Sequence, residues 1–399
     1  MTPTTPRTGV TSTSAGPGWR HQNAGGGGGV LDAGTLAAYD RGAATYAGRA
    51  TPRAVDRAAA FAAARQPDRP ALDLGCGTGR DTGLLGPAVV GLDPSGGMLA
   101  EARAAHPDVP LVRATGGALP FRPRSLGGAW ASKSLQHVAA VHLPLVLADL
   151  HRALAVGAPL HLRVFAGEGV AVSEEQDDLP GRRFTCWTAE HLAELVTGAG
   201  FVDVVATTSG RGAEPEWPHL DVTATRGRTL ADTVGPGMRL LVSGLNPSLH
   251  AADAGVGYAG PGNRFWPALA EAGLLPDGAD RDPWRLLADG RIGMTDLVKR
   301  ATPRAAELTT AEYRAGVERL DRLCALLAPE AVVLVGLDGW RKGADRAARP
   351  GWQDRRLGPS PVYVMPSTSG LNAGTSRADL VAHLRTAAGA GPAPGGARP

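Results

Sequence analysis

The sequence predicts an α/β protein of more than one domain, in which helices cover mainly parallel β-sheets. Short β-rich runs alternate along the chain with Ala-, Leu- and Arg-rich stretches of helical character, and this alternation is typical of such sheets. The chain has 399 residues, which is too long for one ordinary domain and suits two or three, each with its own core. No repeat links the two halves, so a fusion of unrelated domains fits better than a duplication.

The composition is that of a globular protein. Hydrophobic residues make up 43% of the sequence and charged residues 20%. No apolar run reaches about 18 residues, and the Thr- and Gly-rich N-terminus lacks the apolar core of an export signal. The three cysteines, Cys76, Cys186 and Cys324, have neither disulfide nor metal-ligand spacing. We therefore expect a cytoplasmic protein with no membrane contact and no bound metal.

The first domain is expected over residues 31–226, after a Gly-rich tail at 1–30 that buries too little surface to fold. Residues 220–225 alternate in polarity like an edge strand that closes the sheet. The other predicted strands are 71–74, 89–92, 111–114, 128–131 and 159–165, and the predicted helices include 56–64, 95–105, 145–154 and 189–199.

The second domain is expected over residues 228–387, beyond a short polar seam near 225–230, and a Gly-, Ala- and Pro-rich tail is expected over 388–399. A basic cluster of Lys299, Arg300 and Arg304 either contacts a chain of phosphates or belongs to a solvated helix face. The predicted strands of this domain are 239–242, 291–298, 330–336 and 362–365.

Three motifs in the second domain together predict a pocket for an extruded base. The strand-like run 240–244 leads into an Asn-Pro turn, the Gly- and Pro-rich loop 257–263 carries one aromatic residue, and a small polar turn follows at 367–372. Together they resemble the mismatch-specific uracil/thymine DNA glycosylases. The resemblance covers about residues 228–387 and implies the α/β/α fold of uracil-DNA glycosylases and a double-stranded DNA substrate with a mismatched uracil or thymine.

The resemblance assigns roles to individual residues of this domain. Asn246 would be the catalytic residue, and because an amide is no strong base, it would orient the attacking water. The alternative is that the Asn-Pro pair has no catalytic role and only forms a turn. Tyr258 would stack on the base from an exposed loop, with Phe265 and Trp266 in the core. The implied base pocket is Gly244, Leu245, Pro247, Tyr258, Asn263 and Asp296, and the implied DNA-binding and wedge turn is Ser367, Thr368, Ser369, Gly370, Leu371 and Asn372.

Two positions depart from the glycosylase pattern. Asp296 stands where relatives have Asn or Lys, which affects the range of bases accepted, and Ala373 stands where some relatives have an Arg that contacts the opposite base. No Lys lies at the Asn246 turn and no cysteine set could hold an iron–sulfur cluster, so a monofunctional enzyme without a cofactor is implied. Leu371 is the natural wedge, because an apolar tip can fill the vacated stack.

The first domain carries a different motif. Residues 71–74 form a strand-like run that ends in the Gly-rich turn 75–79, and a second such run ends at Asp93. Backbone amides of such a turn approach a cofactor while the acid accepts hydrogen bonds from ribose hydroxyls. Over residues 36–226 this resembles the class I S-adenosylmethionine-dependent methyltransferases, with a Rossmann-like fold. The implied S-adenosylmethionine site is Asp73, Gly75, Cys76, Gly77, Gly79, Asp93, Met98 and Thr115, where Thr115 replaces an Asp of many relatives.

The methyl acceptor implied by the resemblance is a small molecule. Residues 132–137 read Ser-Lys-Ser-Leu-Gln-His and lack the motifs of the DNA methyltransferases. His137 is either a general base or a structural histidine, and His142, His151 and His161 are expected to be structural or on the surface. Two alternatives stay open: a second domain that senses DNA lesions without turnover, and a first domain that only binds its cofactor. The oligomeric state is not determined by the sequence.

Overall fold

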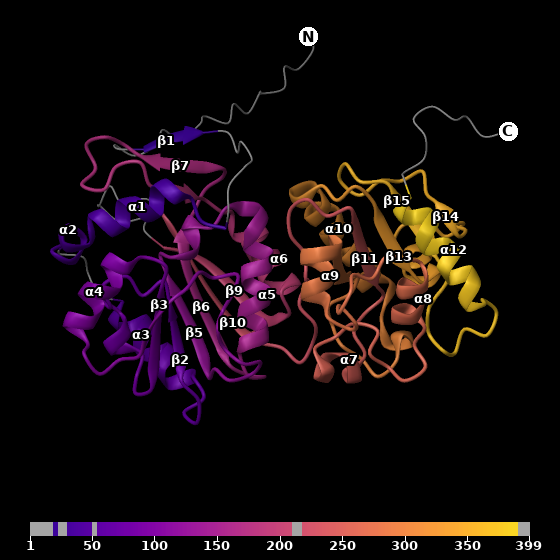
Figure 1. Ribbon diagram of the computed structural model, residues 1–399, viewed down its shortest axis with the longest axis horizontal. Coiled ribbons are helices and arrows are strands. Elements are labelled where there is room, and N and C mark those ends of the chain that lie inside the picture. Colours follow the sequence, from indigo (N-terminus) through magenta and orange to yellow (C-terminus); the bar gives the residue numbers. More distant parts are fainter. Residues whose placement is uncertain (1–18, 23–29, 50–53, 210–217, 390–399) are drawn as a thin grey trace, which may run out of the picture.

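The computed structural model describes residues 19–22, 30–49, 54–209 and 218–389. It consists of two three-layer α/β domains that lie side by side (Figure 1), which confirms the predicted fold class. In the described residues β10 of the first large sheet and β14 of the second run antiparallel to the other strands, so both sheets are mixed rather than purely parallel. Among the described residues, no helix has both the length and the apolar character needed to cross a membrane.

The first domain is built on a seven-stranded sheet with strand order β4-β3-β2-β5-β6-β10-β9. Six of the strands were predicted to within one residue at each end. The sheet consists of β4 (Leu111–Arg113), β3 (Val89–Asp93), β2 (Ala71–Leu74), β5 (Gly128–Ser132), β6 (Pro159–Phe165), β10 (His219–Arg226) and β9 (Phe201–Ser209).

The edge strand of this sheet is not the one predicted. β10, expected at the edge, pairs antiparallel with β6 on one side and with β9 on the other. β9 lies at the edge and is exposed at most positions, whereas β10 is largely buried. The polar alternation of residues 220–225 suggested an edge, but Asp221 is buried between Arg163 of β6 and Ser209 of β9. These partners come from distant parts of the chain.

Helices cover both faces of the first sheet. Trp130 of β5 packs with Phe61 on one face, while Ala129 and Ala131 point to the other, where α5 and α6 supply the core. The helices of this domain are α1 (Ala33–Arg41), α2 (Ala43–Ala47), α3 (Val55–Ala64), α4 (Gly96–Ala105), α5 (Leu143–Ala153) and α6 (Ala189–Gly198), with 3-10 turns at Thr82–Leu84, Leu135–His137 and Ala140–His142.

A small antiparallel sheet lies above the first domain. It consists of β1 (Trp19–Gln22), β7 (Val170–Ser173) and β8 (Arg183–Thr185), with β7 in the middle. The 1–30 segment, expected to be a tail, therefore contains one strand that pairs with β7. This pairing joins residues about 150 positions apart, which local sequence patterns do not reveal.

The second domain has a five-stranded sheet with strand order β12-β11-β13-β15-β14. The first four strands run parallel, and β14 pairs antiparallel at the far edge. The strands are β12 (Ile292–Asp296), β11 (Leu240–Gly244), β13 (Val332–Val335), β15 (Val362–Met365) and β14 (Gly351–Trp352). Four of these were predicted, and the two-residue β14 was not.

The helices of the second domain also cover both sheet faces. Leu241 of β11 packs with α10, whereas Leu240 and Val242 pack with α8 and α12. The helices are α7 (Leu249–Ala254), α8 (Phe265–Glu271), α9 (Pro283–Gly290), α10 (Thr310–Leu327), α11 (Leu337–Gly343) and α12 (Arg377–Ala388), with a 3-10 turn at Ala305–Glu307.

The two domains share one hydrophobic core, to which α5 and α6 of the first domain and α10 of the second contribute. At its border Asp232 is 3% exposed and binds Lys299 and Arg319, at 2.7 and 2.6 Å. The backbone N–H of Asp232 donates to the carbonyl of Gly198 in α6. A Cβ on Gly198 would lie 2.6 Å from Asp232 Oδ2, so a glycine is needed for this approach. The domains are therefore packed together rather than tethered by a free linker.

Candidate functional site

The Gly-rich turn after β2 has a backbone conformation that requires glycine at two positions. Gly75 has φ +70°, and a Cβ there would lie 2.2 Å from Cβ of Ser134. Gly77 has φ +54° and faces open space, since a Cβ there would have no atom within 4 Å. Both conformations lie in the left-handed region that glycine adopts freely. A ligand can therefore approach the turn closely at Gly77.

Asp93, at the end of β3, is fixed beside this turn. Its Oδ2 accepts a hydrogen bond from the N–H of Gly77 and its Oδ1 accepts one from the N–H of Ser95, each at 2.9 Å. Burial raises the pKa of Asp93 to about 6, although the two backbone hydrogen bonds act in the opposite direction. Each carboxylate oxygen keeps a second lone pair that can accept from a ligand hydroxyl.

Asp73 is the second buried acid of this site. Thr82 donates its hydroxyl to Asp73 Oδ2 at 2.6 Å. Burial is the main reason that the pKa of Asp73 is raised to about 7, and the nearby Asp81 and Asp93 raise it further. A cationic ligand beside Asp73 would reverse this shift, because it favours the ionised carboxylate.

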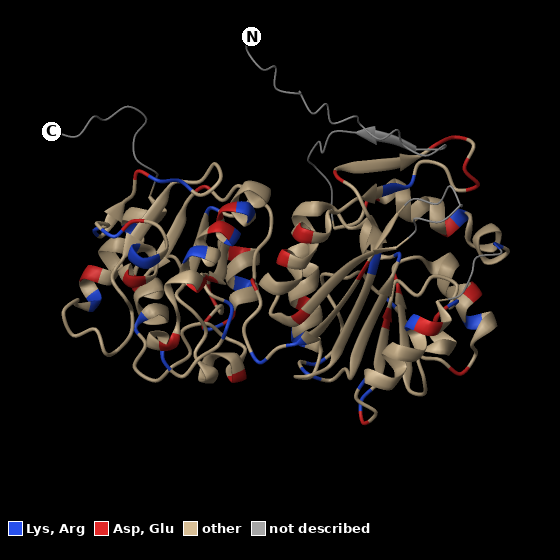
Figure 2. Ribbon diagram, turned by 180° about the vertical axis from the view of Figure 1, so that it is seen from behind, with Lys and Arg blue, Asp and Glu red and all other residues tan. Residues whose placement is uncertain are grey.

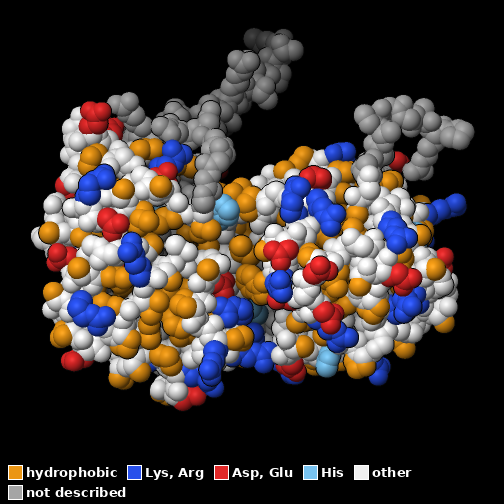
Figure 3. Space-filling view, in the orientation of Figure 1, with side chains coloured by type: hydrophobic (Ala, Val, Ile, Leu, Met, Phe, Trp, Pro, Cys, Tyr) orange, Lys and Arg blue, Asp and Glu red, His pale blue; other side chains and the backbone are white. Residues whose placement is uncertain are grey.

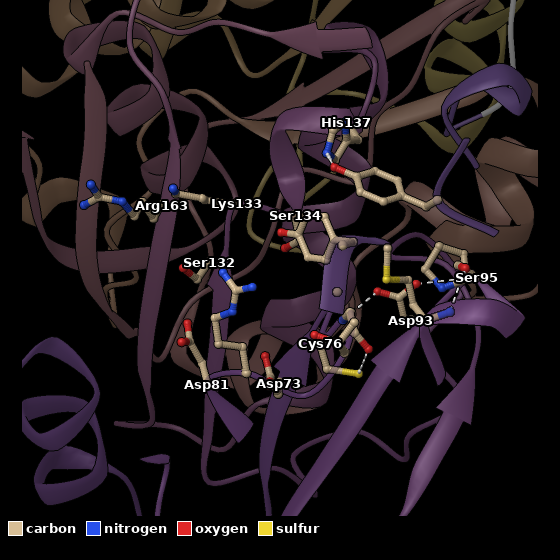
Figure 4. Close-up of a pocket in the computed structure, with 18 of the residues that line it drawn as sticks. Asp73, Cys76, Asp81, Asp93, Ser95, Ser132, Lys133, Ser134, His137 and Arg163 are labelled. Carbon is tan, nitrogen blue, oxygen red and sulfur yellow. Dashed lines mark hydrogen bonds between the residues drawn. The ribbon is translucent and has the colours of Figure 1, made fainter. Parts of the chain in front are cut away.

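A cavity of about 360 Å³ opens in front of these residues (Figure 4). Six of the predicted cofactor residues line it: Asp73, Gly75, Cys76, Gly77, Asp93 and Met98. Two others do not. A Cβ on Gly79 would lie 2.7 Å from the ring of His106, so this glycine lets the histidine approach, and Thr115 is exposed outside the cavity lining. The cavity also contains Tyr39, Arg80 and Arg163, which the sequence motifs did not indicate.

His137 lies across the cavity from Asp73 and Asp81 (Figure 4). Its Nδ1 lies 2.8 Å from the carbonyl of Arg183, which makes Nδ1 the donor, and its Nε2 lies 2.8 Å from the hydroxyl of Tyr39 and accepts from it. Burial lowers the pKa of His137 to about 4. A histidine with both nitrogens bonded and so low a pKa fits a structural role better than that of a general base. His151 and His161 are also buried.

The second candidate site lies at the carboxyl edge of the second sheet. Gly244 and Asp296 are paired neighbours at the ends of β11 and β12. A Cβ on Gly244 would lie 2.5 Å from Asp296 Oδ1 and 3.2 Å from the hydroxyl of Tyr258. The structure therefore brings three predicted pocket residues together around a position that only glycine can occupy.

Asn246 follows Gly244 and Leu245 and is held through its side-chain amide. Its Nδ2 donates to Thr302 Oγ1 at 2.7 Å and to the carbonyl of Arg300 at 3.0 Å. The adjacent backbone is held as well, since the N–H of Thr302 donates to the carbonyl of Pro247. With the nitrogen side occupied, no hydrogen bond to Oδ1 is found within the described residues, which leaves this oxygen as an acceptor.

Tyr258 differs from the expectation of an exposed stacking residue. Its ring is stacked on that of Phe265, with centroids 4.1 Å apart, and Phe265 is fully buried. The Tyr258 hydroxyl is buried and has no hydrogen-bond partner among the described residues. Its backbone has φ +58°, which is unusual for a residue other than glycine. One ring face is therefore taken by Phe265, and the loop sequence gives no sign of this packing.

Asn263 and Arg264 organise the loop that carries Tyr258. The side-chain oxygen of Asn263, predicted to help form the base pocket, accepts a hydrogen bond from the N–H of Phe265 at the start of α8. Arg264 donates to three carbonyls in the polar turn and just after it, those of Ser369, Asn372 and Thr375. These hydrogen bonds were not predicted, because a single arginine in the sequence does not show which backbone carbonyls, more than 100 residues away, it will contact.

The polar turn presents Leu371 at its tip. The Leu371 side chain is 97% exposed, far more than any other large hydrophobic residue of the described chain. Hydrogen bonds stabilise this turn: the N–H of Leu371 donates to Ser369 Oγ, and Asn372 Nδ2 donates to the carbonyl of Ser367. Thr368 is buried and its carbonyl accepts from the N–H of Arg264.

The basic cluster considered for DNA binding is divided by the fold. Lys299 is buried and bound to Asp232, and the exposed Arg300 is paired with Glu312 at 2.6 Å. Lys299 is therefore not available to phosphates. Within the described residues, no group of three or more His, Cys, Asp or Glu side chains is arranged to hold a metal ion.

Two regions of the chain match protein-family models. Residues 231–387 match the model described as the uracil DNA glycosylase superfamily, and residues 71–157 match the model described as a methyltransferase domain. The chain therefore joins a methyltransferase domain with a Rossmann-like fold to a domain of the uracil DNA glycosylase superfamily.

Solved methyltransferase structures are similar to part of this chain. The 1,6-didemethyltoxoflavin N1-methyltransferase of Burkholderia thailandensis, solved with 1,6-didemethyltoxoflavin and S-adenosylhomocysteine, is 24% identical over 48% of this chain and 85% of that chain, with a TM-score of 0.37. A possible histamine N-methyltransferase of Thermotoga maritima is 18% identical over 48% and 99%, with a TM-score of 0.37. A methyltransferase of Leishmania major is 17% identical over 48% and 81%, with a TM-score of 0.40.

Proposed function

We propose that the second domain is a monofunctional DNA glycosylase that removes uracil, thymine or a damaged pyrimidine opposite guanine in double-stranded DNA. The observation that carries this proposal is the anchored amide of Asn246, whose Oδ1 is left as an acceptor where β11 ends. The exposed tip Leu371 follows β15 at the same edge of the parallel sheet. A water-orienting group and an apolar wedge on one edge suit the excision of an extruded base.

The reaction replaces the bond between the sugar C1′ and the base nitrogen by a bond to water. The base leaves with the bonding electrons, the water oxygen bonds to C1′, and one water proton is released. Asn246 Oδ1 accepts a hydrogen bond from that water and places it for attack. Because an amide removes protons poorly, the rate depends on how stable the departing base anion is. We therefore expect uracil to leave faster than thymine.

The lysines of the second domain do not support a Schiff-base step. Lys299 is bound to Asp232, and Lys342 lies over the ring of Tyr313 at 5.2 Å. A Schiff base needs a neutral amine at C1′. Hydrolysis that leaves an intact abasic strand is the expected outcome.

A release assay on the full chain tests this proposal. Uracil should be released from a G·U duplex, more slowly from G·T, and not from G·C, with an abasic product that breaks only after alkali. Binding of the G·U duplex without any release would instead support the alternative, a lesion-sensing module.

For the first domain we propose an S-adenosylmethionine-dependent methyltransferase that acts on a small molecule. The residues fit such a cofactor: the carboxylates of Asp73 and Asp93 line the same cavity as the open backbone of Gly77. Asp93 would accept from the ribose diol, Asp73 would bind the ammonium group and Met98 would flank the adenine. The bound cofactor supplies an electrophilic methyl group.

The chain's own part in this transfer is to hold the acceptor and keep out water. The cavity wall away from Asp93 is formed by polar residues such as Ser132, Ser134 and Arg163. We expect catalysis by proximity, because His137 is bonded through both nitrogens.

Calorimetry with S-adenosylmethionine tests this assignment. The wild-type protein should bind it, and Asp93→Ala should weaken binding by about 10- to 100-fold, since a hydrogen bond to a charged acceptor contributes about 1.5 to 3 kcal/mol. Absence of binding by the wild type would exclude a working methyltransferase.

A further inference from the structure

A second large cavity, of about 490 Å³, lies between the two domains. The first domain contributes Arg124, Arg152 and Arg226 to its wall, and the second contributes Tyr258 and Asp296, both assigned above to the base pocket. The cavity is within the range of small-molecule sites, about 300 to 1,000 Å³. The base pocket of the second domain therefore continues into a space that the first domain closes.

Four arginines line this cavity, Arg124, Arg152, Arg226 and Arg281, against three acids, Asp253, Asp282 and Asp296. Arg152 is already paired with Asp149. Arg124 donates to the carbonyls of Ala252 and Asp253, and Arg226 donates to carbonyls of the first domain, including that of His151. Within the part of the chain that is described, Arg124, Arg226 and the cavity residue Arg281 form no ion pair. Burial and the charge of Arg124 lower the pKa of Arg226 to about 10, although the charge of Asp253 acts in the opposite direction. Neighbouring guanidinium groups of this kind favour an anion between them.

The space-filling view agrees with this distribution. Lys and Arg side chains gather in the lower part of the seam between the two halves (Figure 3), and basic residues mark the segment that joins the domains when it is seen from behind (Figure 2). The exposed Arg228 belongs to this segment and is paired with Asp253. Arg228 is therefore already paired, whereas Arg124, Arg226 and Arg281 hold no ion pair within the described residues.

The opposite wall offers a donor and an acceptor without partners. The Tyr258 hydroxyl is buried and unbonded among the described residues, and Asp296 has no side-chain hydrogen bond there. Both lie against the backbone of Gly244. A buried hydroxyl without a partner is costly, which indicates that a ligand supplies the missing acceptor. The carbonyl and N–H groups on the edge of a uracil provide both an acceptor and a donor.

We propose that the cavity is a nucleotide site built by both domains, which binds the base of a uracil nucleotide at Tyr258 and Asp296 and its phosphate at Arg124 and Arg281. The base side rests on the function proposed for the second domain. The phosphate side is new: it assigns the methyltransferase domain a role in holding the nucleotide. The nucleotide is either a free mononucleotide or a nucleotide extruded from DNA, and both carry the same base and a phosphate.

Calorimetry on the full chain with 2′-deoxyuridine 5′-monophosphate tests the site. We expect binding of one molecule per chain, at least tenfold tighter than binding of deoxyuridine or of inorganic phosphate alone. Arg124→Gln and Arg281→Gln should each weaken binding of the nucleotide by about 3- to 10-fold and leave deoxyuridine binding unchanged, since only the phosphate loses a partner. Tyr258→Phe should weaken both ligands by about the same factor.

Arg122→Gln is the matched control, because Arg122 is an exposed arginine two residues from Arg124 and does not line the cavity. Arg281 has no hydrogen bond in the described chain, so its variant should fold even if Arg124→Gln disturbs the domain contact. Absence of nucleotide binding by the wild type overturns the proposal. It is also overturned if Arg124→Gln and Arg281→Gln both bind like Arg122→Gln.

A competition assay identifies the source of the nucleotide. Competitive inhibition of uracil release from DNA by the mononucleotide would identify the extruded nucleotide as the natural occupant, whereas binding without inhibition would identify a free nucleotide. Uracil release without nucleotide binding would refute the cavity proposal alone. Nucleotide binding without uracil release would refute the glycosylase alone.

Discussion

The side-chain amide of Asn246 donates a hydrogen bond to Oγ1 of Thr302 over 2.7 Å, across 56 positions of the chain. Thr302 is itself buried and its hydroxyl donates to the carbonyl of Arg304. The orientation of the amide is thus set by a loop that follows β12. With Nδ2 directed into the protein, Oδ1 is the atom left for a water molecule.

Replacing Asn246 by Ala should reduce the rate of uracil release by at least about 100-fold while the affinity for a G·U duplex stays the same, because water placement acts only in the chemical step. Single-turnover release and equilibrium DNA binding measure the two quantities. Thr302→Val, which removes only the acceptor that holds the amide, should cause a smaller loss in the same step. Equal rates for wild type and Asn246→Ala would remove Asn246 from the mechanism.

Leu371→Ala should reduce uracil release from a G·U duplex more than from single-stranded DNA. The wedge is needed where a base must leave a stack, at a cost of a few kcal/mol, and a single strand has already met much of that cost. The ratio of the two rates is the measurement, and Leu371→Met, which keeps an apolar tip, should stay close to wild type. Equal losses on both substrates would show that Leu371 supports the pocket instead.

Binding of S-adenosylmethionine should strengthen between pH 6 and pH 8. The pKa of Asp73 is raised from its ordinary 3.8 to about 7, so at pH 6 a proton must leave before the carboxylate can bind an ammonium group. The affinity should change by up to about tenfold per pH unit below the pKa. Titration calorimetry at several pH values checks the slope, which Asp73→Asn should abolish. A slope that persists in this variant would assign it to another group.

The raised pKa of Asp73 also makes the stability of the ligand-free protein depend on pH. Because the folded protein holds the Asp73 proton more tightly than the unfolded chain does, this group contributes to the free energy of unfolding in full below pH 3.8. The contribution is lost as the pH rises through about 7. Asp73→Asn should therefore narrow the difference in Tm between pH 5 and pH 8.

Asp232→Ala should destabilise the protein strongly at neutral pH. Its removal leaves Lys299 and Arg319 without their buried partner, a loss of about 3 to 5 kcal/mol for a broken buried pair. These cations keep the pKa of Asp232 below its ordinary value, so its stabilisation is present at neutral pH and is lost as the pH falls through that pKa. Denaturant unfolding measures the effect.

Glu330→Ala serves as the control for that measurement. Glu330 is paired with Arg291, and both side chains are more than half exposed, so its loss should change unfolding very little. Similar unfolding of Asp232→Ala and Glu330→Ala would show that the buried cluster stabilises the protein no more than an exposed ion pair does.

By itself the sequence determined the two α/β domains, because buried strands and amphipathic helices leave local periodic patterns and Gly-rich or Asn-Pro turns have local signatures. For the same reason it located the Gly77 and Asp93 turn and the Asn246 turn. Only the tertiary structure placed β9 rather than β10 at the sheet edge, since the partners that bury Asp221 come from distant segments. It alone showed that Asn263 accepts a hydrogen bond from the N–H of Phe265 and that Tyr258 packs on Phe265.

The tertiary structure also decided which charges are available to a ligand. Lys299 looked like a candidate for phosphate binding, but Asp232, which lies 67 positions earlier in the chain, takes it into the domain interface. Arg124 and Arg281 gave no local signal, yet the docking of the domains places them in one cavity. Burial and pairing depend on which surfaces meet, and a linear pattern carries little information about contacts between separate domains.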